Sequence, residues 1–112
     1  VRFSCTPAVF QLIREEPRRF PPEQTAYSKP IAGQSKWNAG PLDTLDPNPA
    51  GDSHPYPVEI RLPRWTVERD WDLRIWLFRW GAGIRIEHPL ALREHQLQQA
   101  KELVALYRSS PS

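Results

Sequence analysis

Alternating apolar and polar residues mark three short segments of this chain. Residues 1–6 read Val-Arg-Phe-Ser-Cys-Thr, and residues 58–62 and 84–86 alternate in the same way. Successive side chains of a strand point to opposite faces of a sheet. The pattern therefore predicts three strands with one buried face each, and residues 24–28 form a weaker fourth candidate.

Three longer segments repeat apolar residues at the spacing of a helix. The first begins at Pro7, after a Thr6 hydroxyl that can accept from free backbone N–H groups, and ends near residue 16. The second runs from a Thr66 cap to about residue 80, where Gly81 begins a turn. This helix has more apolar residues than fit on one narrow face. It is therefore either buried over much of its surface or in contact with a second subunit. The third opens at residues 88–89, extends to about residue 108, and places on one face Leu97, Ala100, Val104 and Tyr107.

The elements follow one another as strand, helix, strand, strand, helix and strand, with an extra helix at the end. Two split βαβ units of this kind normally close into an antiparallel four-stranded sheet with both helices on one face. We therefore predict an α+β chain of ferredoxin-like βαββαβ architecture plus an additional C-terminal helix. The apolar strand positions would face the helices, and the open face would show Arg2, Ser4, Glu59, Arg61, Arg85 and Glu87.

Residues 29–55 differ from the rest of the chain in composition. They are rich in Pro, Gly, Asn, Asp and Ser and contain almost no aliphatic side chains. Such a segment buries too little apolar surface to offset its ordering entropy, so we expect a mobile surface insertion between the second and third strands. Trp37 is the exception. A single tryptophan in a polar loop more often attaches the loop to its own domain than binds a partner.

The chain has 112 residues, of which 39% are hydrophobic, so we expect a single domain over residues 1–112 with a thin core. Five tryptophans, four phenylalanines and three tyrosines supply much of that core. The chain contains no methionine, which suggests a fragment of a larger protein. Its single cysteine, Cys5, has no partner for an internal disulfide and is expected to be a small buried strand residue.

The charge and hydropathy of the chain bear on whether it contacts a membrane or a nucleic acid. No apolar run approaches the roughly 20 residues that span a bilayer, and no signal-peptide pattern opens the chain. We therefore expect no membrane contact and a cytoplasmic location. The net charge of +2 is too small to indicate a nucleic-acid partner. Phosphate is bound by clustered basic side chains, and the net charge does not show whether the basic residues are clustered.

None of the motifs that support catalysis or cofactor binding is complete. Residues 81–83 read Gly-Ala-Gly, but they follow a helix and precede a strand, the reverse of what phosphate binding needs. The three histidines, His54, His88 and His95, lie in different elements, and His88 is better explained as a helix cap than as a ligand. We therefore expect no catalytic residue, no metal, no cofactor and no enzyme activity. An enzyme domain completed by another chain is the least favoured alternative.

Five arginines near the third strand, the second helix and the fourth strand are the remaining candidates for ligand contact. Ordinary ion pairs on a solvated surface explain most such residues. The sharper interpretation is an anion, a nucleotide or a single-stranded nucleic acid held by several guanidinium groups. The open sheet face offers no aromatic platform for base stacking. The five residues are Arg61, Arg64, Arg74, Arg79 and Arg85.

A resemblance to a known family covers nearly all of the chain except residues 29–55. Its most specific part is residues 68–89, which read ERDWDLRIWLFRWGAGIRIEHP, followed by Leu92-Arg93 and by a helix that ends in Leu106-Tyr107. Earlier, Val-Arg-Phe at the start and Pro-Pro-Glu-Gln at residues 21–24 resemble the family's opening. The pattern is similar to the C-terminal extension (WCX) domain of WYL-domain bacterial transcriptional regulators.

The resemblance implies a ferredoxin-like, non-catalytic module for oligomerisation and regulation. In such proteins the module follows a DNA-binding winged helix-turn-helix and a WYL sensor domain, neither of which lies in this chain. It implies a homodimer in the parent protein, DNA contact through that missing helix-turn-helix, and a single-stranded nucleic acid or nucleotide as effector. Some relatives accompany CRISPR or other phage-defence loci, so a defence-linked regulator is a further implication. The alternative is a ligand-binding module that uses the five arginines.

Overall fold

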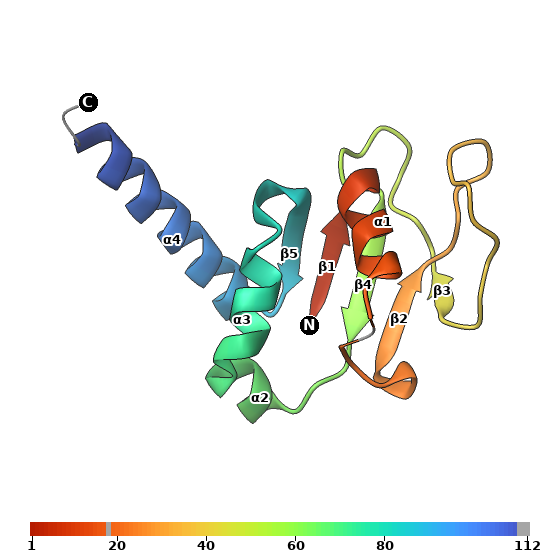
Figure 1. Ribbon diagram of the computed structural model, residues 1–112, viewed down its shortest axis with the longest axis horizontal. Coiled ribbons are helices and arrows are strands. Elements are labelled where there is room, and N and C mark those ends of the chain that lie inside the picture. The colour runs from red at the N-terminus through yellow and green to blue at the C-terminus, as the bar shows by residue number, and fades with distance from the viewer. Residues whose placement is uncertain (18, 110–112) are drawn as a thin grey trace.

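The structure, a computed structural model, describes residues 1–17 and 19–109. Figure 1 labels the helices and strands along the chain. They are β1 (Arg2–Cys5), α1 (Pro7–Glu15), the 3-10 turn η1 (Pro22–Gln24), β2 (Thr25–Ser28), β3 (Asp43–Leu45), β4 (Tyr56–Ile60), α2 (Arg64–Arg69), α3 (Trp71–Phe78), the 3-10 turn η2 (Gly81–Gly83), β5 (Ile84–His88) and α4 (Leu90–Ser109). The predicted α+β class is confirmed.

The strands form one mixed sheet in the order β3-β2-β4-β1-β5. The β2–β4, β4–β1 and β1–β5 pairs are antiparallel, whereas β2 and β3 run parallel. The prediction of a purely antiparallel, four-stranded sheet is therefore wrong, because residues 29–55 contribute a fifth strand. Its three residues read Asp-Thr-Leu, which is too short and too polar to show the alternation that marks a strand.

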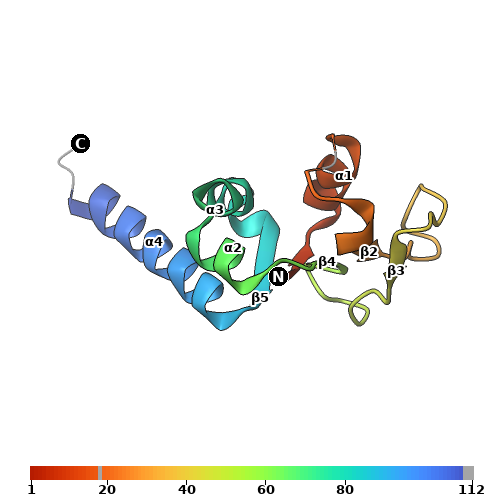
Figure 2. The same ribbon diagram turned by 90° about the horizontal axis from the view of Figure 1, so that it is seen from below.

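The helices α1 and α3 lie on one face of the sheet, and Figure 2 shows both above the strands. The predicted core is confirmed, because Phe3, Ile60 and Ile86 are all buried. Cys5 is buried among them, as expected, and burial raises the pKa of its thiol. Further core side chains come from the two helices: Phe10, Ile13, Leu73, Trp76 and Leu77.

The second predicted helix is in fact two. It begins at Arg64 rather than after Thr66, and it breaks at Asp70. The carboxylate of Asp70 accepts hydrogen bonds from the backbone N–H groups of Asp72 and Leu73, which caps α3. An aspartate at this position supplies acceptors for the free N–H groups of a helix start. The apolar periodicity runs through this cap, which is why the sequence suggested one helix.

The insertion is attached to the core by Trp37, as predicted. Its ring lies 5.4 Å from the ring of Phe10 and 5.2 Å from that of Tyr56. The Arg14 guanidinium lies 4.9 Å over the same indole and bonds the carboxylate of Asp43 at 2.6 Å. These contacts join α1 to β3. The predicted mobility of residues 29–55 stays a prediction.

Candidate interaction surfaces

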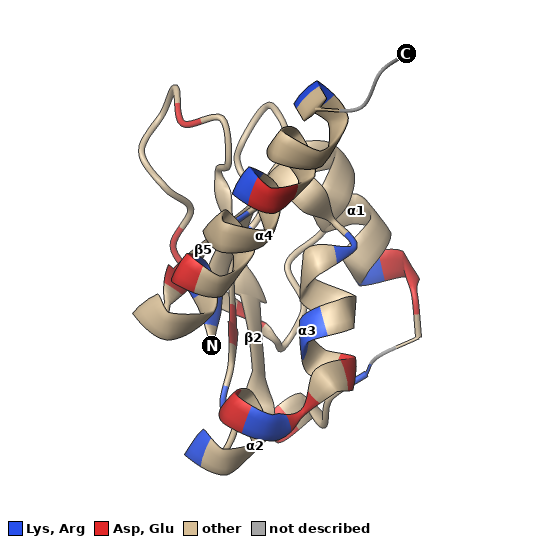
Figure 3. Ribbon diagram, turned by 90° about the vertical axis from the view of Figure 1, so that its left-hand side faces the viewer, with Lys and Arg blue, Asp and Glu red and all other residues tan. Residues whose placement is uncertain are grey.

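The five predicted arginines do not converge on one point. Arg64 pairs with Glu68 at 2.9 Å, and Arg74 donates to the backbone carbonyl of Glu68 at 2.7 Å. Arg79 lies against Trp80 and within 3.9 Å of a Glu16 oxygen at the end of α1. These three arginines belong to the helical side of the molecule. Figure 3 shows acidic positions as well as basic ones along α2 and at the start of α3.

The other two predicted arginines lie at the strands. Arg61 is exposed just beyond β4, and its backbone N–H donates to the carbonyl of Gln24. Arg85 projects from β5 on the open face of the sheet, where both of its terminal nitrogens donate to Asp52 at 3.0 Å. The structure thus brings Arg64 and Arg74 together at Glu68 and places Arg85 in a different network. Four of the five guanidinium groups already contact a carboxylate or a carbonyl of this chain.

The open face of the sheet is a lattice of charged and polar contacts, as its alternation predicted. Arg2 lies between Glu59 and Glu87, at 3.6 and 3.5 Å, and the hydroxyl of Ser4 donates to Glu87. Asn48, from the insertion, donates to Ser4 at 2.9 Å. Together with the Asp52–Arg85 pair, this contact holds residues 46–55 over the face. The described strand residues present no aromatic ring there on which a base could stack.

The Asp52–Arg85 pair makes the stability of this covering segment dependent on pH. Hydrogen bonds from the Arg85 guanidinium, with a further one from the His54 backbone N–H, hold the pKa of Asp52 at about 2, below its ordinary 3.8. The folded state therefore favours the ionised carboxylate. Its contribution is complete above the ordinary pKa and is lost as the pH falls from 3.8 toward 2.

We expect an Asp52→Asn variant to lose less stability on acidification than the unaltered chain. The variant begins less stable near pH 5, and the difference between the two chains disappears near pH 2, because protonated Asp52 no longer binds Arg85 as an anion. Urea unfolding at steps of pH measures both curves. Parallel curves over this interval would contradict the assigned pair.

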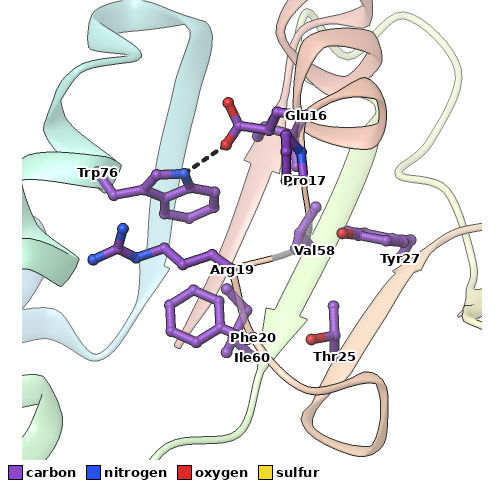
Figure 4. A pocket seen from close by; sticks show the side chains of 10 residues that line it. Glu16, Pro17, Arg19, Phe20, Thr25, Tyr27, Val58, Ile60 and Trp76 are labelled. Carbon is purple, nitrogen blue, oxygen red and sulfur yellow. Dashed lines mark hydrogen bonds between the residues drawn. The ribbon is translucent and has the colours of Figure 1, made fainter.

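A very small cavity lies on the helix side of the core. Its volume is about 10 Å³, and its lining includes Ile13, Phe20 and Trp76. Figure 4 shows the Trp76 indole donating to Glu16, at 2.8 Å, across this space. Such a volume holds about one water molecule. It is therefore a packing defect rather than a ligand site.

The three histidines lie in different parts of the fold. His54 contacts the carbonyl of Ala82, His88 ends β5, and His95 stacks on Phe78. Among the described residues, no three His, Cys, Asp or Glu side chains gather as metal ligands. The suggestion that His88 caps the last helix is wrong, because it belongs to the strand and α4 starts two residues later.

The helix α3 buries one side and exposes apolar residues on the other. Leu73, Trp76 and Leu77 face the core, whereas Trp71 and Ile75 are about two-thirds exposed, at 65% and 64%. Trp65 on α2 is exposed to the same extent, at 66%. Some of the many apolar residues in this segment are therefore buried in the core, and the others are exposed on the surface. Tryptophan and arginine on a surface are typical of protein–protein contacts.

The helix α4 leaves the body of the molecule (Figure 1). Its 20 residues extend for about 30 Å, whereas β5 beside it has five residues and spans about 17 Å. Only Leu92, near the start of α4, is buried. The apolar face predicted for this helix therefore exists but is not covered along its C-terminal half. We call it the α4 stripe: Leu97, Ala100, Leu103, Val104 and Tyr107.

A groove of about 620 Å³ separates α4 from β5. In the described sheet β5 pairs with β1 only, so its other edge faces this groove. Its charged residues are two arginines, Arg85 and Arg93. We call this space the β5–α4 groove. Its apolar lining consists of Phe78, Ala82, Ile84, Ile86, Leu97, Ala100 and Leu103.

The groove was not predicted from the sequence. The signal for it is the difference in length between a five-residue strand and the 20-residue helix that follows it. A helix that continues an apolar face beyond the end of the sheet must leave part of that face without an internal partner. Apolar periodicity alone gave no reason to expect this.

Comparisons with known proteins do not identify the chain. It matches no protein-family model, no curated protein and no solved structure. Within the described residues, no helix combines the length and the apolar character needed to cross a membrane.

Proposed function

We propose that this chain is a non-catalytic oligomerisation and regulatory domain of a WYL-type helix-turn-helix transcriptional regulator. The observation that supports it most is the exposed apolar surface of α3 and α4, in particular Trp71, Ile75 and the α4 stripe. Exposed apolar residues that lie together on one helix face are typical of surfaces that contact another protein. Much of this surface lies on α4, the longest helix of the described structure.

The arrangement of the sheet also supports the proposal. Without β3, the strand order is β2-β4-β1-β5 with every neighbouring pair antiparallel. This is the order that two split βαβ units give when they close in the ferredoxin-like manner. We propose that the fold is a ferredoxin-like sheet with one parallel edge strand added by the insertion, as the resemblance to the WCX domain implies.

The parent protein would then act as a homodimer in the cytoplasm. DNA would be bound by a helix-turn-helix elsewhere in that protein, and a link to a CRISPR or phage-defence locus belongs to the same proposal. The arginine-based alternative has weaker support. Arg64, Arg79 and Arg85 already contact carboxylates, at distances between 2.9 and 3.9 Å, and an anionic ligand would have to compete with these contacts.

We expect the parent protein to be a dimer and this chain to associate as its concentration rises. Size-exclusion chromatography with light scattering gives the molar mass of each species directly. The matched comparison is the parent with and without this domain, which should differ in mass by more than the mass of one domain. A parent protein that is monomeric throughout would contradict the proposal.

A further inference from the structure

We propose that two copies of this chain associate through α4, with the helices antiparallel and each α4 stripe seated in the β5–α4 groove of the other copy. The inference rests on the proposed function, because it specifies the surface and the partner of the association. It joins two features that are exposed in a single copy: the α4 stripe and the β5–α4 groove, whose lining is more apolar than polar.

The stripe and the groove are parts of one continuous surface. Leu97, Ala100 and Leu103 belong to both, because they line the groove and lie on the stripe. Leu103 is 55% exposed and Tyr107 is 76% exposed, so the surface continues to the last turns of α4. A patch that is both groove and stripe is self-complementary, which is the requirement for a contact with two-fold symmetry.

The groove suits a helix rather than a compact ligand. It extends from η2 to Leu103 along more than half of α4, and paired helices lie about 8–10 Å apart. Because the contact is reciprocal, both grooves and both stripes are covered at once.

Two charged residues of α4 favour the antiparallel direction. Glu94 and Lys101 are seven residues apart, two helical turns, and therefore lie on the same side of the helix beside Leu97. Neither forms an ion pair with any residue in the described part of the chain. When two α4 helices cross antiparallel near residues 97–98, each Glu94 meets the Lys101 of the other copy. A parallel pair in register would instead place like charges opposite each other.

The test measures self-association of this chain by sedimentation equilibrium, with three sets of variants. Leu103→Glu places a charge in the apolar contact of both copies, and we expect the dimer dissociation constant to rise about 30-fold or more. Leu12→Glu is the matched control, because Leu12 is exposed to a similar extent, at 52%, on α1. We expect it to leave the constant unchanged.

The charge variants test the direction of the helices. Glu94→Lys and Lys101→Glu alone should each weaken the dimer about three- to tenfold, because each creates two repulsive contacts at the rim of the interface. The double variant should return to within about twofold of the unaltered chain. Circular dichroism confirms that each variant is folded, which is expected because the altered side chains are exposed.

The outcomes separate this inference from the proposed function. A dimer that is unchanged by Leu103→Glu, or charge variants that do not restore each other, would overturn the α4 contact and leave association through α3 standing. An unaltered chain that stays monomeric at millimolar concentration would also overturn the α4 contact, and the mass of the parent protein would then decide the proposed function separately.

Discussion

Replacement of Phe10 by alanine is expected to destabilise the fold by about 3–5 kcal/mol, the range for a large aromatic removed from a core. Phe10 is fully buried. Its ring stacks on Tyr56 at 4.7 Å and contacts Tyr27 and Trp37 at 6.0 and 5.4 Å. The loss therefore affects α1, the sheet and the insertion together, because one ring joins all three.

Urea unfolding followed by tryptophan fluorescence measures this effect. Leu12→Ala is the matched control on the same helix, because Leu12 is about half exposed and its truncation should change the free energy of unfolding by less than about 1 kcal/mol. A Phe10→Ala variant no less stable than this control would show that the aromatic cluster does not form.

Replacement of Asp43 by alanine is expected to cost about 3 kcal/mol. The Asp43 side chain is only 2% exposed, and it accepts from Arg14 at 2.6 Å and from the backbone N–H of Gly40 at 2.7 Å. Removing one partner of a buried pair leaves the other charge without compensation, at about 3–5 kcal/mol. We expect the lower end of that range, because Arg14 is 24% exposed and stays partly hydrated.

Asp46→Ala provides the control for this prediction. Asp46 lies in the same segment and also forms an ion pair, with Lys29 at 3.0 Å, but its side chain is 87% exposed. Exposed pairs contribute about 0–1 kcal/mol, so this variant should be close to neutral. Equal effects of the two substitutions on urea unfolding would mean that β3 is not held in the sheet by Asp43.

The elements that could be predicted from the sequence are those with a clear apolar period. The alternation of residues 1–6 and 84–86 indicated two strands, and the burial of Phe3 and Ile86 confirms which side faces the core. The helix after Thr6 was also correct, because the cap and the proline both mark its start, and the Thr6 hydroxyl accepts from Val9. In each case local chemistry and tertiary packing agree.

The elements that were missed depend on single polar contacts. The strand β3 is held by the Asp43–Arg14 pair, which joins residues 29 positions apart, and no local pattern reports such a pair. The break between α2 and α3 depends on the carboxylate of Asp70, which is one of several acidic residues in that segment. A cap of this kind can be distinguished from an ordinary surface charge only when the packing is known.

Some properties of the candidate surfaces could be predicted from the sequence and others could not. The polar character of the open sheet face followed from alternation, because every second residue of a strand faces outward. The sequence did not show which arginines form ion pairs within the chain, because the partner of Arg85 is Asp52, in a loop 33 positions away. The exposure of the α4 stripe did not follow either, because helical periodicity predicts that a face exists and gives no information about what covers it.

Association through α4 requires that a second copy covers the C-terminal half of this helix. Amide hydrogen exchange along α4, measured at protein concentrations below and above the dissociation constant, tests this directly. We predict that residues 97–109 exchange rapidly in the dilute chain and become protected at high concentration, while the exchange of β1 and β4 stays constant. Association without any change in the exchange of residues 97–109 would contradict the account.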